Sequence, residues 1–336
     1  MSAPRTGSAL MLALITIVVL STLMVSFLFR IHLESDLAAR ARFGMKAGHL
    51  ARGGQEYAKW MLLKALRAGN EPGEDMEERF FVATKNLQQG VAIREYEIET
   101  REGRILVSIT PETSRRNVNR LSDADWEQML ENTGVPNRHH ARIIACFKDW
   151  TDADEATRLL GAEADDPHYQ DQELPVKNGP IDSLNELGMI KGFTKSILHG
   201  GILDDFYDEP EARVTGILPL LSVYGDGSVN INSAAREVLM TVSGIREEQV
   251  DRLIEGRWGP DQIPGTEDDG YQDATRAMAV AGLPADAHST FSTADLRWVR
   301  VHTVGEAGPV RKSIHAIYEF SGNQLTLLSY EESGGH

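Results

Sequence analysis

Two groups of carboxylates lie about ten residues apart in the middle of the chain. A hard cation such as Ca²⁺ takes about six to eight oxygen ligands at roughly 2.3–2.6 Å. Because a turn between the two groups would let their side chains converge on one ion, the pattern predicts a calcium site. The alternative is an acidic loop solvated by water, as most charge runs are. The six candidate ligands are Asp149, Asp152, Asp154, Glu163, Asp165 and Asp166.

A second acidic loop provides a weaker metal candidate. The run from Asp261 to Asp269, Asp-Gln-Ile-Pro-Gly-Thr-Glu-Asp-Asp, resembles the aspartate-rich calcium loops of thrombospondin type 3-like repeats. Its oxygen ligands would come from four acids, Asp261, Glu267, Asp268 and Asp269. For a single copy, a polar loop built on turn residues is the favoured alternative. Both interpretations stand at this point.

A possible helical hairpin lies between the first and the second acidic loop. Ser243-Gly244-Ile245 joins two amphipathic runs, as in helix-hairpin-helix motifs, whose loop amides can bind a phosphate. A DNA-binding version would carry Lys, Gly or Thr beside the loop, but here Glu247 and Glu248 follow. A structural hairpin is therefore favoured over a DNA-binding one. Residues 181–195 show the same two-helix rhythm.

Residue patterns typical of enzymes are missing from the sequence. It contains no P-loop, no dinucleotide-binding glycine motif, no His-Glu-x-x-His and no nucleophile elbow. The side chains of His139 and His140 would diverge on a helix, which disfavours metal binding there. Cys146 lies in an apolar helical run and is predicted to be a small core residue. We therefore expect a protein that is not an enzyme.

The composition argues against a nucleic-acid partner and excludes a disulfide within the chain. The chain has 336 residues, 41% of them hydrophobic, and a net charge of -16 from 50 acidic and 34 basic residues. Nucleic-acid binding rewards clustered Lys and Arg, so no nucleic-acid partner is expected. With one cysteine, the chain cannot form a disulfide within itself.

The first thirty residues predict a membrane anchor. Residues 8–29 contain no charge and no Pro, and Arg5 and Arg30 flank them. About 22 residues at roughly 1.5 Å per residue span a bilayer core. The balance of basic residues favours a cytoplasmic N-terminus. Residues 30–67 continue as an amphipathic stalk helix, in which Gly44, Gly48, Gly53 and Gly54 either weaken the helix or mark close packing.

The rest of the chain predicts an α+β fold. Alternating runs at 91–99 and 104–110 predict a hairpin, and three further strands are expected in 296–304, 313–320 and 325–330. All of these can share one small antiparallel, pilin-like sheet. The block between them becomes a large inserted helical domain with helix-hairpin-helix-like (SAM-like) elements. The expected segments are 1–7, 8–29, 30–67, 74–119, 120–290 and 291–330.

The ordered motifs resemble those of one protein family. They are a basic lead ending in Gly7, a small-residue apolar helix, a stalk rich in Leu, Ala and Arg, and Phe-Lys-Asp-Trp-Thr-Asp-Ala-Asp (147–154). Asn-Gly-Pro-Ile-Asp-Ser-Leu-Asn-Glu-Leu (178–187) and Val-Asn-Ile-Asn-Ser-Ala (229–234) follow. This order resembles the K-type minor pseudopilins of type II secretion systems.

The resemblance implies processing at the N-terminus. In that family a prepilin peptidase cuts after the glycine, here Gly7, and methylates the new first residue, here Ser8. Most pilin-like subunits carry Glu at the fifth mature position, where it meets a neighbour's terminal amine, and K-type subunits lack it. The fifth residue here is Leu12. Because an unpartnered carboxylate in lipid is costly, Leu12 suits a subunit with no neighbour ahead of it.

The resemblance also implies function, place and partners. It implies a minor pseudopilin that caps the pseudopilus tip, anchored by one helix in the inner membrane with its body in the periplasm. The partners would be I- and J-type minor pseudopilins, the pseudopilus, the prepilin peptidase and the inner-membrane assembly platform. The family carries calcium in its inserted domain, which supports the first acidic loop. The alternative is a membrane-anchored helix-hairpin-helix protein that binds DNA.

Overall fold

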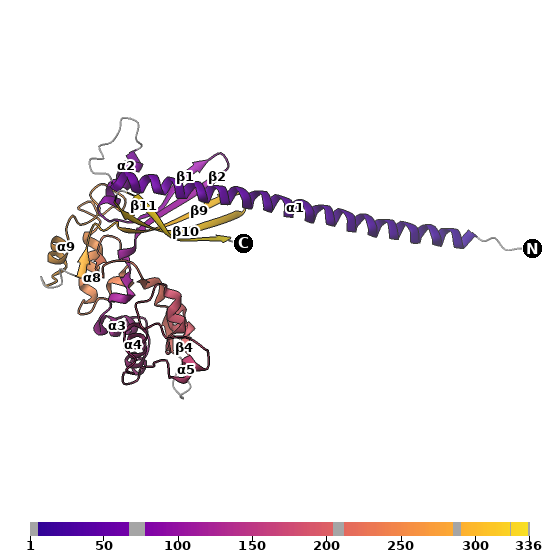
Figure 1. Ribbon diagram of the computed structural model, residues 1–336. Helices are drawn as coiled ribbons and strands as arrows, with labels where there is room; N and C mark the ends of the chain where they lie inside the picture. The colour runs from indigo at the N-terminus through magenta and orange to yellow at the C-terminus, as the bar shows by residue number, and fades with distance from the viewer. Residues whose placement is uncertain (1–5, 67–77, 204–211, 285–289, 323, 335–336) are drawn as a thin grey trace, which may run out of the picture.

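One very long helix organises the structure, a computed structural model that describes residues 6–66, 78–203, 212–284, 290–322 and 324–334. The helix α1 (Thr6–Leu66) has 61 residues and, at about 1.5 Å per residue, is roughly 90 Å long. Its N-terminal part extends away from the body (Figure 1), and residues 10–38 are exposed. The helix from Leu10 onward is long and apolar enough to cross a membrane, with a mean hydropathy of 2.6 over its most apolar window.

The C-terminal part of α1 packs against a sheet. Small and apolar residues recur at alternating intervals of four and three and are buried, namely Ala47, Ala51, Gly54, Ala58 and Met61. That spacing places them on one face of a helix. The opposite face stays polar, as the exposed Arg52 and Glu56 show. The predicted stalk helix therefore forms, and it ends at Leu66, next to the expected boundary.

The sheet has five strands in the order β1-β2-β9-β10-β11, and every neighbouring pair is antiparallel. Residues alternate between a face buried under α1 and a half-exposed face, as in β9. Strands from before and after the inserted block thus share one sheet, as the sequence predicted. The strands are β1 (Ile93–Thr100), β2 (Gly103–Pro111), β9 (Trp298–Ala307), β10 (Val310–Ser321) and β11 (Gln324–Gly334).

The inserted block between β2 and β9 lies at one end of the sheet (Figure 1). Its helices are α3 (Asp123–Asn132), α4 (Asn137–Thr151), α5 (Pro167–Gln170), α6 (Lys195–His199), α7 (Arg236–Leu239), α8 (Glu247–Gly256) and α9 (Ala274–Ala281). Four 3-10 turns cover Glu112–Ser114, Val118–Arg120, Leu184–Met189 and Leu218–Leu220. The block has two hydrophobic cores, one around Trp126 and Phe147 and the other around Leu253 and Met278.

Two features differ from the helical block and sheet expected from the sequence. Three two-stranded ladders interrupt the block, and two of them are parallel: β3 (Arg116–Asn117) with β6 (Leu221–Ser222), and β7 (Val229–Asn230) with β8 (Phe291–Ser292). The third pairs β4 (Gly200–Leu203) with β5 (Ala212–Thr215). Strands of two to four residues are too short to show an alternating pattern.

The other difference is a helix, α2 (Glu78–Gln88), in the segment assigned to the sheet. Its buried Phe80 and Leu87 lie on one face, and Phe80 stacks on Trp60 of α1 with ring centroids 4.3 Å apart. The helix packs beside α1 and next to the start of β1. Its eleven residues carry a short apolar stripe, which tertiary packing rather than propensity stabilises.

A buried ion pair joins the sheet to the inserted block. Glu112 is fully buried, and both of its oxygens accept from Arg300 of β9, the shorter contact being 2.6 Å. The Ser222 hydroxyl, in the short ladder of the block, donates to the same carboxylate at 2.5 Å. A charge removed from water needs such partners. The sheet and the inserted block are therefore connected through one carboxylate.

Candidate functional site

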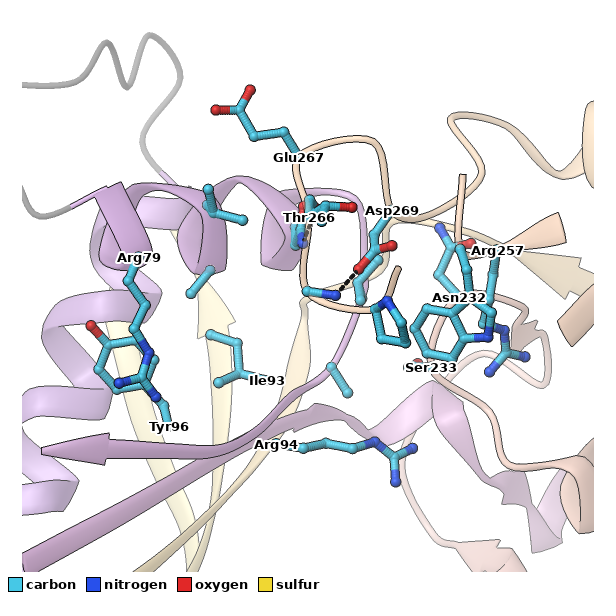
Figure 2. A pocket seen from close by; sticks show the side chains of 18 of the residues that line it. Arg79, Ile93, Arg94, Tyr96, Asn232, Ser233, Arg257, Thr266, Glu267 and Asp269 are labelled. Atoms are coloured by element: carbon cyan, nitrogen blue, oxygen red, sulfur yellow. Dashed lines mark hydrogen bonds between the residues drawn. The ribbon is translucent and has the colours of Figure 1, made fainter. Parts of the chain in front are cut away.

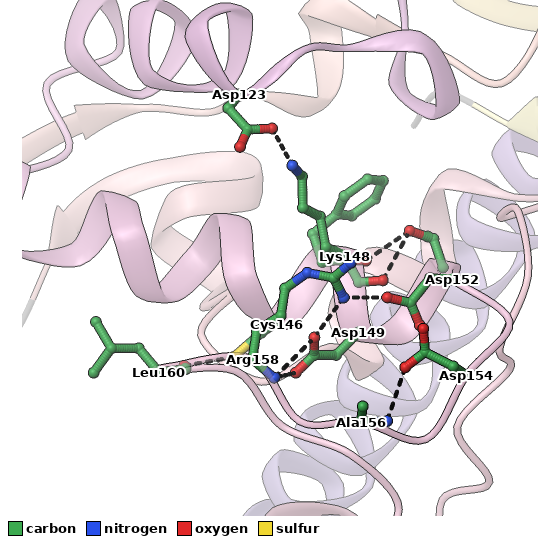
Figure 3. A network of polar contacts seen from close by, with 11 residues as sticks. Asp123, Cys146, Lys148, Asp149, Asp152, Asp154, Ala156, Arg158 and Leu160 are labelled. Carbon is green, nitrogen blue, oxygen red and sulfur yellow. Dashed lines mark hydrogen bonds and ion pairs between the residues drawn. The ribbon is translucent and has the colours of Figure 1, made fainter.

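The last turn of α4 presents the first of the predicted metal ligands. Asp149 is fully buried and follows Cys146 by three residues, so both lie on the face of α4 that packs into the block. Burial raises the pKa of the Cys146 thiol to about 11, which suits the inert core role predicted for it. The loop after α4 then passes over the Asp149 carboxylate (Figure 3).

Arg158 brings a positive charge between two of the acids. Its Nη1 donates to Asp149 Oδ1 at 2.8 Å and also contacts Asp152 (Figure 3). Its backbone N–H donates to Asp149 Oδ2 at 3.2 Å. These hydrogen bonds raise the pKa of the guanidinium, which stays protonated. Arg158 therefore neutralises part of the negative charge of this cluster.

Glu163 faces the same cluster without a partner. Its side chain is 2% exposed, and neither carboxylate oxygen has a hydrogen-bond partner among the described residues. Burial raises the pKa of Glu163, and the charges of Asp149, Asp152 and Asp154 raise it further. Buried polar atoms are usually satisfied. The orphaned carboxylate therefore fits a cation that it would share with Asp149 and Asp152.

Gly161 lets the loop approach Asp149 closely. A Cβ at this position would overlap Asp149 Oδ2. Close approach of backbone to a binding group is one of the uses of glycine. The loop is thus shaped around the carboxylate that would be the deepest ligand.

The other predicted ligands of this loop have different tasks. Asp154 is exposed, and its Oδ1 accepts from the Ala156 N–H at 2.9 Å. Asp166 caps α5 and pairs with Lys191 at 2.6 Å. Asp165 is exposed. The structure therefore places Glu163 near enough to Asp149 and Asp152 for their charges to interact, and directs Asp166 toward Lys191.

The cluster does not have the geometry of a loaded metal site. Within the parts of the chain that the structure describes, no three acidic, His or Cys side chains converge closely enough to hold a metal ion. Arg158 lies between Asp149 and Asp152, so a bound ion would have to displace its guanidinium. An ion at this cluster would therefore be an alternative to Arg158 as the counter-charge of these carboxylates.

The second acidic loop is also folded around its own carboxylates. The Asp269 side chain is 1% exposed; its Oδ2 accepts from the Gly265 N–H at 2.5 Å, and its Oδ1 has no described partner. Asp268 accepts from the Thr266 hydroxyl at 2.8 Å. Asp261 accepts from the Ile263 N–H at 2.8 Å. Burial raises the pKa of Asp269, and the charges of Asp268 and Asp261 add to it.

The fourth acid of this loop points to a different element. Glu267 pairs with Lys85 of α2 at 2.9 Å. The loop thus gathers Asp261, Asp268 and Asp269, while Glu267 ties it to α2.

The predicted helical hairpin is present, and the charge of its arginine is neutralised by acidic residues. Gly244 adopts a left-handed φ of 81° in the turn between α7 and α8, a conformation that favours glycine. Arg236 of α7 pairs with Glu247 at 2.6 Å and with Asp251 at 3.0 Å. A phosphate at this hairpin would meet paired arginine and exposed Glu248. The contacts therefore support a structural role for the hairpin.

A family model matches the part of the chain that holds the first cluster. Residues 106–200 match the model described as type II secretion system (T2SS), protein K. That segment runs from β2 through α4 and the acidic loop to α6. Over this segment the chain is similar to the protein K family of type II secretion systems.

The fold of this chain is similar to one seen in a crystal structure. A chain of the GspK-GspI-GspJ complex from the enterotoxigenic Escherichia coli type 2 secretion system matches it with a TM-score of 0.52. The match covers 84% of this chain and 96% of that chain, at 13% sequence identity. Identity at this level shows a shared fold. No curated protein matches the chain.

These findings confirm the predicted family and fold class. The long apolar helix, the antiparallel sheet and the additional helices match the fold of the secretion-complex chain, and α1 is long and apolar enough to cross a membrane. Gly7 and Ser8 lie in the first turn of α1, whereas the lead before Thr6 falls outside the described residues.

Sequence reasoning missed Arg158 and the role of Gly161 in the first acidic loop. Arg158 is the only basic residue between Asp149 and Asp166, which was an available signal for a counter-charge. Gly161 follows two leucines and precedes Ala162, so nothing in its surroundings indicated a carboxylate beneath it. Only the folded loop shows that contact.

Proposed function

We propose that this minor pseudopilin caps the tip of the type II secretion pseudopilus. The observation that carries the proposal is Leu12, an apolar residue on the exposed stretch of α1 where most pilin-like subunits hold a glutamate. A subunit with a neighbour ahead of it uses that carboxylate to pair with the neighbour's terminal amine. In lipid an unpaired carboxylate is costly, so its replacement by Leu favours a subunit with nothing ahead of it.

The shape of the body also supports a position at the tip of the pseudopilus. Figure 1 shows the inserted block projecting to one side at the end of α1 that lies farthest from the N-terminus. Successive subunits of a helical filament pack their N-terminal helices together and stack their bodies. A side domain of this size would obstruct a subunit above it, whereas at the tip it meets no neighbour.

A position at the tip of the pseudopilus implies the partners of the chain and its location in the cell. The chain is anchored in the inner membrane by α1, with a cytoplasmic N-terminus and a periplasmic body. A prepilin peptidase cuts between Gly7 and Ser8 and methylates Ser8. I- and J-type pseudopilins then pack beside α1 at the tip, and the assembly platform inserts further subunits below. The role is structural rather than catalytic.

Calcium is proposed as a structural ion of the inserted block. The orphaned, buried Glu163 beside Asp149 and Asp152 supports this proposal. The loop of Asp261, Asp268 and Asp269 is a second candidate, with the unpartnered Asp269 Oδ1 as its support. Bound calcium would neutralise clustered carboxylates and fix the loop after α4.

Co-expression with a prepilin peptidase tests the assignment of Gly7 and Ser8. Mass spectrometry of the purified chain should show a mature N-terminus at methylated Ser8. Gly7→Val should stay uncut, because the peptidase requires a residue without a bulky side chain there. An intact N-terminus on the natural sequence, with a control pseudopilin cut in the same cells, would contradict the assignment.

Substitution of Leu12 tests the tip position. Leu12→Glu places a carboxylate in lipid with no partner ahead, so pseudopilus initiation should fall, by about tenfold or more. Leu12→Met keeps the site apolar and should initiate normally. The measurement is the number of pseudopili per cell when the major subunit is overproduced. Equal numbers for Leu12→Glu and the natural sequence would contradict a tip position.

A further inference from the structure

The five-stranded sheet has two edges, β1 and β11, and they are built differently. Four of the eight residues of β1 are charged, namely Arg94, Glu95, Glu97 and Glu99. A bulge interrupts the pairing of β1 with β2 between Ile93 and Tyr96. Arg79 of α2 donates to the Glu97 carbonyl at 3.4 Å, and its guanidinium lies over the Tyr96 ring (Figure 2). Because charges and bulges on an edge strand discourage pairing with another chain, β1 is a protected edge.

The edge formed by β11 is more open. Residues 324–330 contain no charge and no Pro, and every residue of β11 except Leu325 is exposed. The pairing with β10 shifts at Leu328, and the acids Glu331 and Glu332 follow towards the end of the strand. On its free side β11 has no partner strand among the described residues. A row of backbone N–H and C=O groups therefore faces outward, and an extended chain is the structure that can pair with such a row.

Apolar side chains of β11 are exposed on the face of the sheet that α1 covers. Leu327 and Tyr330 lie opposite Tyr318 and Ala316 of β10, both of which are buried. Residues directly opposite each other share one face of a sheet, so Leu327 and Tyr330 face the side of α1. Their side chains are nevertheless 49% and 47% exposed, because α1 packs mainly over β2, β9 and β10. The sheet thus extends one strand beyond the helix that covers it.

A groove of 330 Å³ lies between α1 and this side of β11. The three charged side chains on its wall are already paired, Lys59 with Glu56 at 2.6 Å and Arg52 with Glu332 at 3.0 Å. The wall therefore leaves no charge for an ionic ligand. Its other residues are Gln55 of α1, Tyr318 of β10, and Leu325, Leu327 and Tyr330 of β11. A neutral, largely apolar occupant fits this groove.

A second copy of this chain does not suit the open edge. α1 runs alongside the strands of the sheet and extends beyond them toward its N-terminus (Figure 1). Two copies of β11 that pair antiparallel, as all neighbouring strands of this sheet do, are related by a two-fold axis normal to the sheet. That axis reverses the direction of α1 in one copy, so the two anchors could not enter one membrane from the same side. A strand of a different protein is therefore favoured.

We propose that the free edge of β11 pairs with an extended strand of a neighbouring minor pseudopilin, and that alternate side chains of this strand enter the groove beside α1. Strand addition of this kind draws affinity from main-chain hydrogen bonds and specificity from pockets for alternate side chains. The choice of neighbour rests on the proposed function, in which I- and J-type pseudopilins pack beside α1. The choice of a strand rests on the open edge of β11 alone.

Binding to the I- and J-type pseudopilins of the same system tests the proposal. The full-length chain and each partner are purified in detergent micelles, and microscale thermophoresis measures the affinity for either partner and for both together. Leu327→Lys places a charge in the groove and should weaken binding by about tenfold or more. Because Leu327 is half exposed, the variant should keep the melting temperature of the natural chain. Val280→Lys, at a position of α9 that is 47% exposed, is the matched control and should bind normally.

Amide hydrogen exchange shows whether the contact is a strand pairing. Successive N–H groups of a strand point to opposite sides, so alternate amides of β11 face the free edge. In the complex these amides should exchange at least about tenfold more slowly than in the free chain, whereas the amides bonded to β10 should change little. A helix or loop that lies in the groove would cover side chains without producing this alternation.

Two results would overturn the strand pairing alone: equal affinity of Leu327→Lys and the natural chain for the partner, or edge amides of β11 that exchange equally fast in the free chain and in the complex. In either case a complex still forms, and the proposed tip position stays intact. A natural chain that binds neither partner up to about 1 mM overturns both the strand pairing and the proposed I- and J-type partners.

Discussion

Arg158 pairs with Asp149 at 2.8 Å, at the point where the loop after α4 folds back over the helix end. The same guanidinium contacts Asp152, while the buried Glu163 faces the cluster with no partner. One arginine thus neutralises part of a cluster that contains more negative than positive charge. A calcium ion in place of the guanidinium would neutralise more of this negative charge, and this difference makes the two counter-charges distinguishable by experiment.

Glu163→Gln should remove the response of the inserted block to calcium. In the natural protein we expect calcium to raise the melting temperature by several degrees, since a ligand that binds only the folded state stabilises it. Glu163→Gln should melt higher than the natural protein in chelator, because it relieves repulsion by Asp149 and Asp152. It should then gain little from calcium. Differential scanning calorimetry in chelator and in calcium measures both effects.

Arg158→Gln should change the melting temperature in the opposite way. Without calcium it should melt lower, because Asp149 stays buried with its charge unpaired. With calcium it should recover more than the natural protein does, since the ion no longer competes with a guanidinium. Glu127→Gln, an exposed acid on α3, is the control and should follow the natural protein. A melt of Arg158→Gln that calcium leaves unchanged would contradict an ion at this cluster.

Adjacent glycines in α1 should respond oppositely to alanine. A Cβ at Gly54 would lie 2.7 Å from Ile105 Cγ2 and 3.2 Å from Thr303 Cβ, whereas a Cβ at Gly53 meets nothing within 4 Å. Gly54→Ala should therefore lower the free energy of unfolding by about 1–3 kcal/mol. Gly53→Ala should raise it by about 0.5–1 kcal/mol through helix propensity. Urea unfolding gives both values, and equal changes would show that α1 does not pack as described.

The buried and exposed Arg–Glu pairs should differ in strength. Glu112 is fully buried and pairs with Arg300 at 2.6 Å, whereas Glu319 pairs with the exposed Arg297 at 3.0 Å. Glu112→Gln should lower the free energy of unfolding by about 3–5 kcal/mol, because Arg300 loses its buried partner. Glu319→Gln should cost about 0–1 kcal/mol. Comparable losses in urea unfolding would argue against Glu112 as the link between sheet and block.

Two stacked histidines should make the sheet sensitive to acid. His302 and His315 face each other across β9 and β10, with ring centroids 4.1 Å apart. Burial lowers the pKa of both, their mutual repulsion lowers that of His302, and Arg300 lowers that of His315; Glu95 and Glu331 oppose these effects.

The sign of the pH effect follows from these lowered pKa values. The unfolded chain takes up protons near about pH 6.5, before the folded chain does. Stability is therefore full above about pH 6.5 and falls as the pH drops through the lower folded pKa values. His302→Gln should reduce the loss of melting temperature between about pH 7.5 and pH 5, by a few degrees. An identical pH dependence for variant and natural protein would show that this pair does not titrate as described.

The sequence predicted the parts of the fold that carry long, regular patterns. The stalk helix, the β1–β2 hairpin and the strands β9 to β11 follow from apolar spacing, and their sharing of one sheet follows from the position of the block. The short parallel ladder between Arg116 and Leu221 has no such pattern, because its partners are distant in sequence and only two residues long. Its formation depends on the packing of the block as a whole.

The candidate site was predictable by residue type but not by arrangement. The acidic run made Asp149, Asp152 and Glu163 candidates, because carboxylates at such a spacing are typical of calcium ligands. It did not separate them from Asp166, which the structure uses to cap α5 and to pair with Lys191. The close approach of Gly161 to Asp149 could not be predicted, because it is a property of the folded loop and not of the local sequence.

Gold labelling of the chain's C-terminus on isolated pseudopili tests the tip position most directly. An epitope tag placed after His336, recognised by gold-conjugated antibody, would mark each copy of the chain in electron micrographs. The account predicts one label at one end of each pseudopilus, and no label along its length. Labels distributed along the filament would contradict it, because a subunit with neighbours both above and below cannot be the cap.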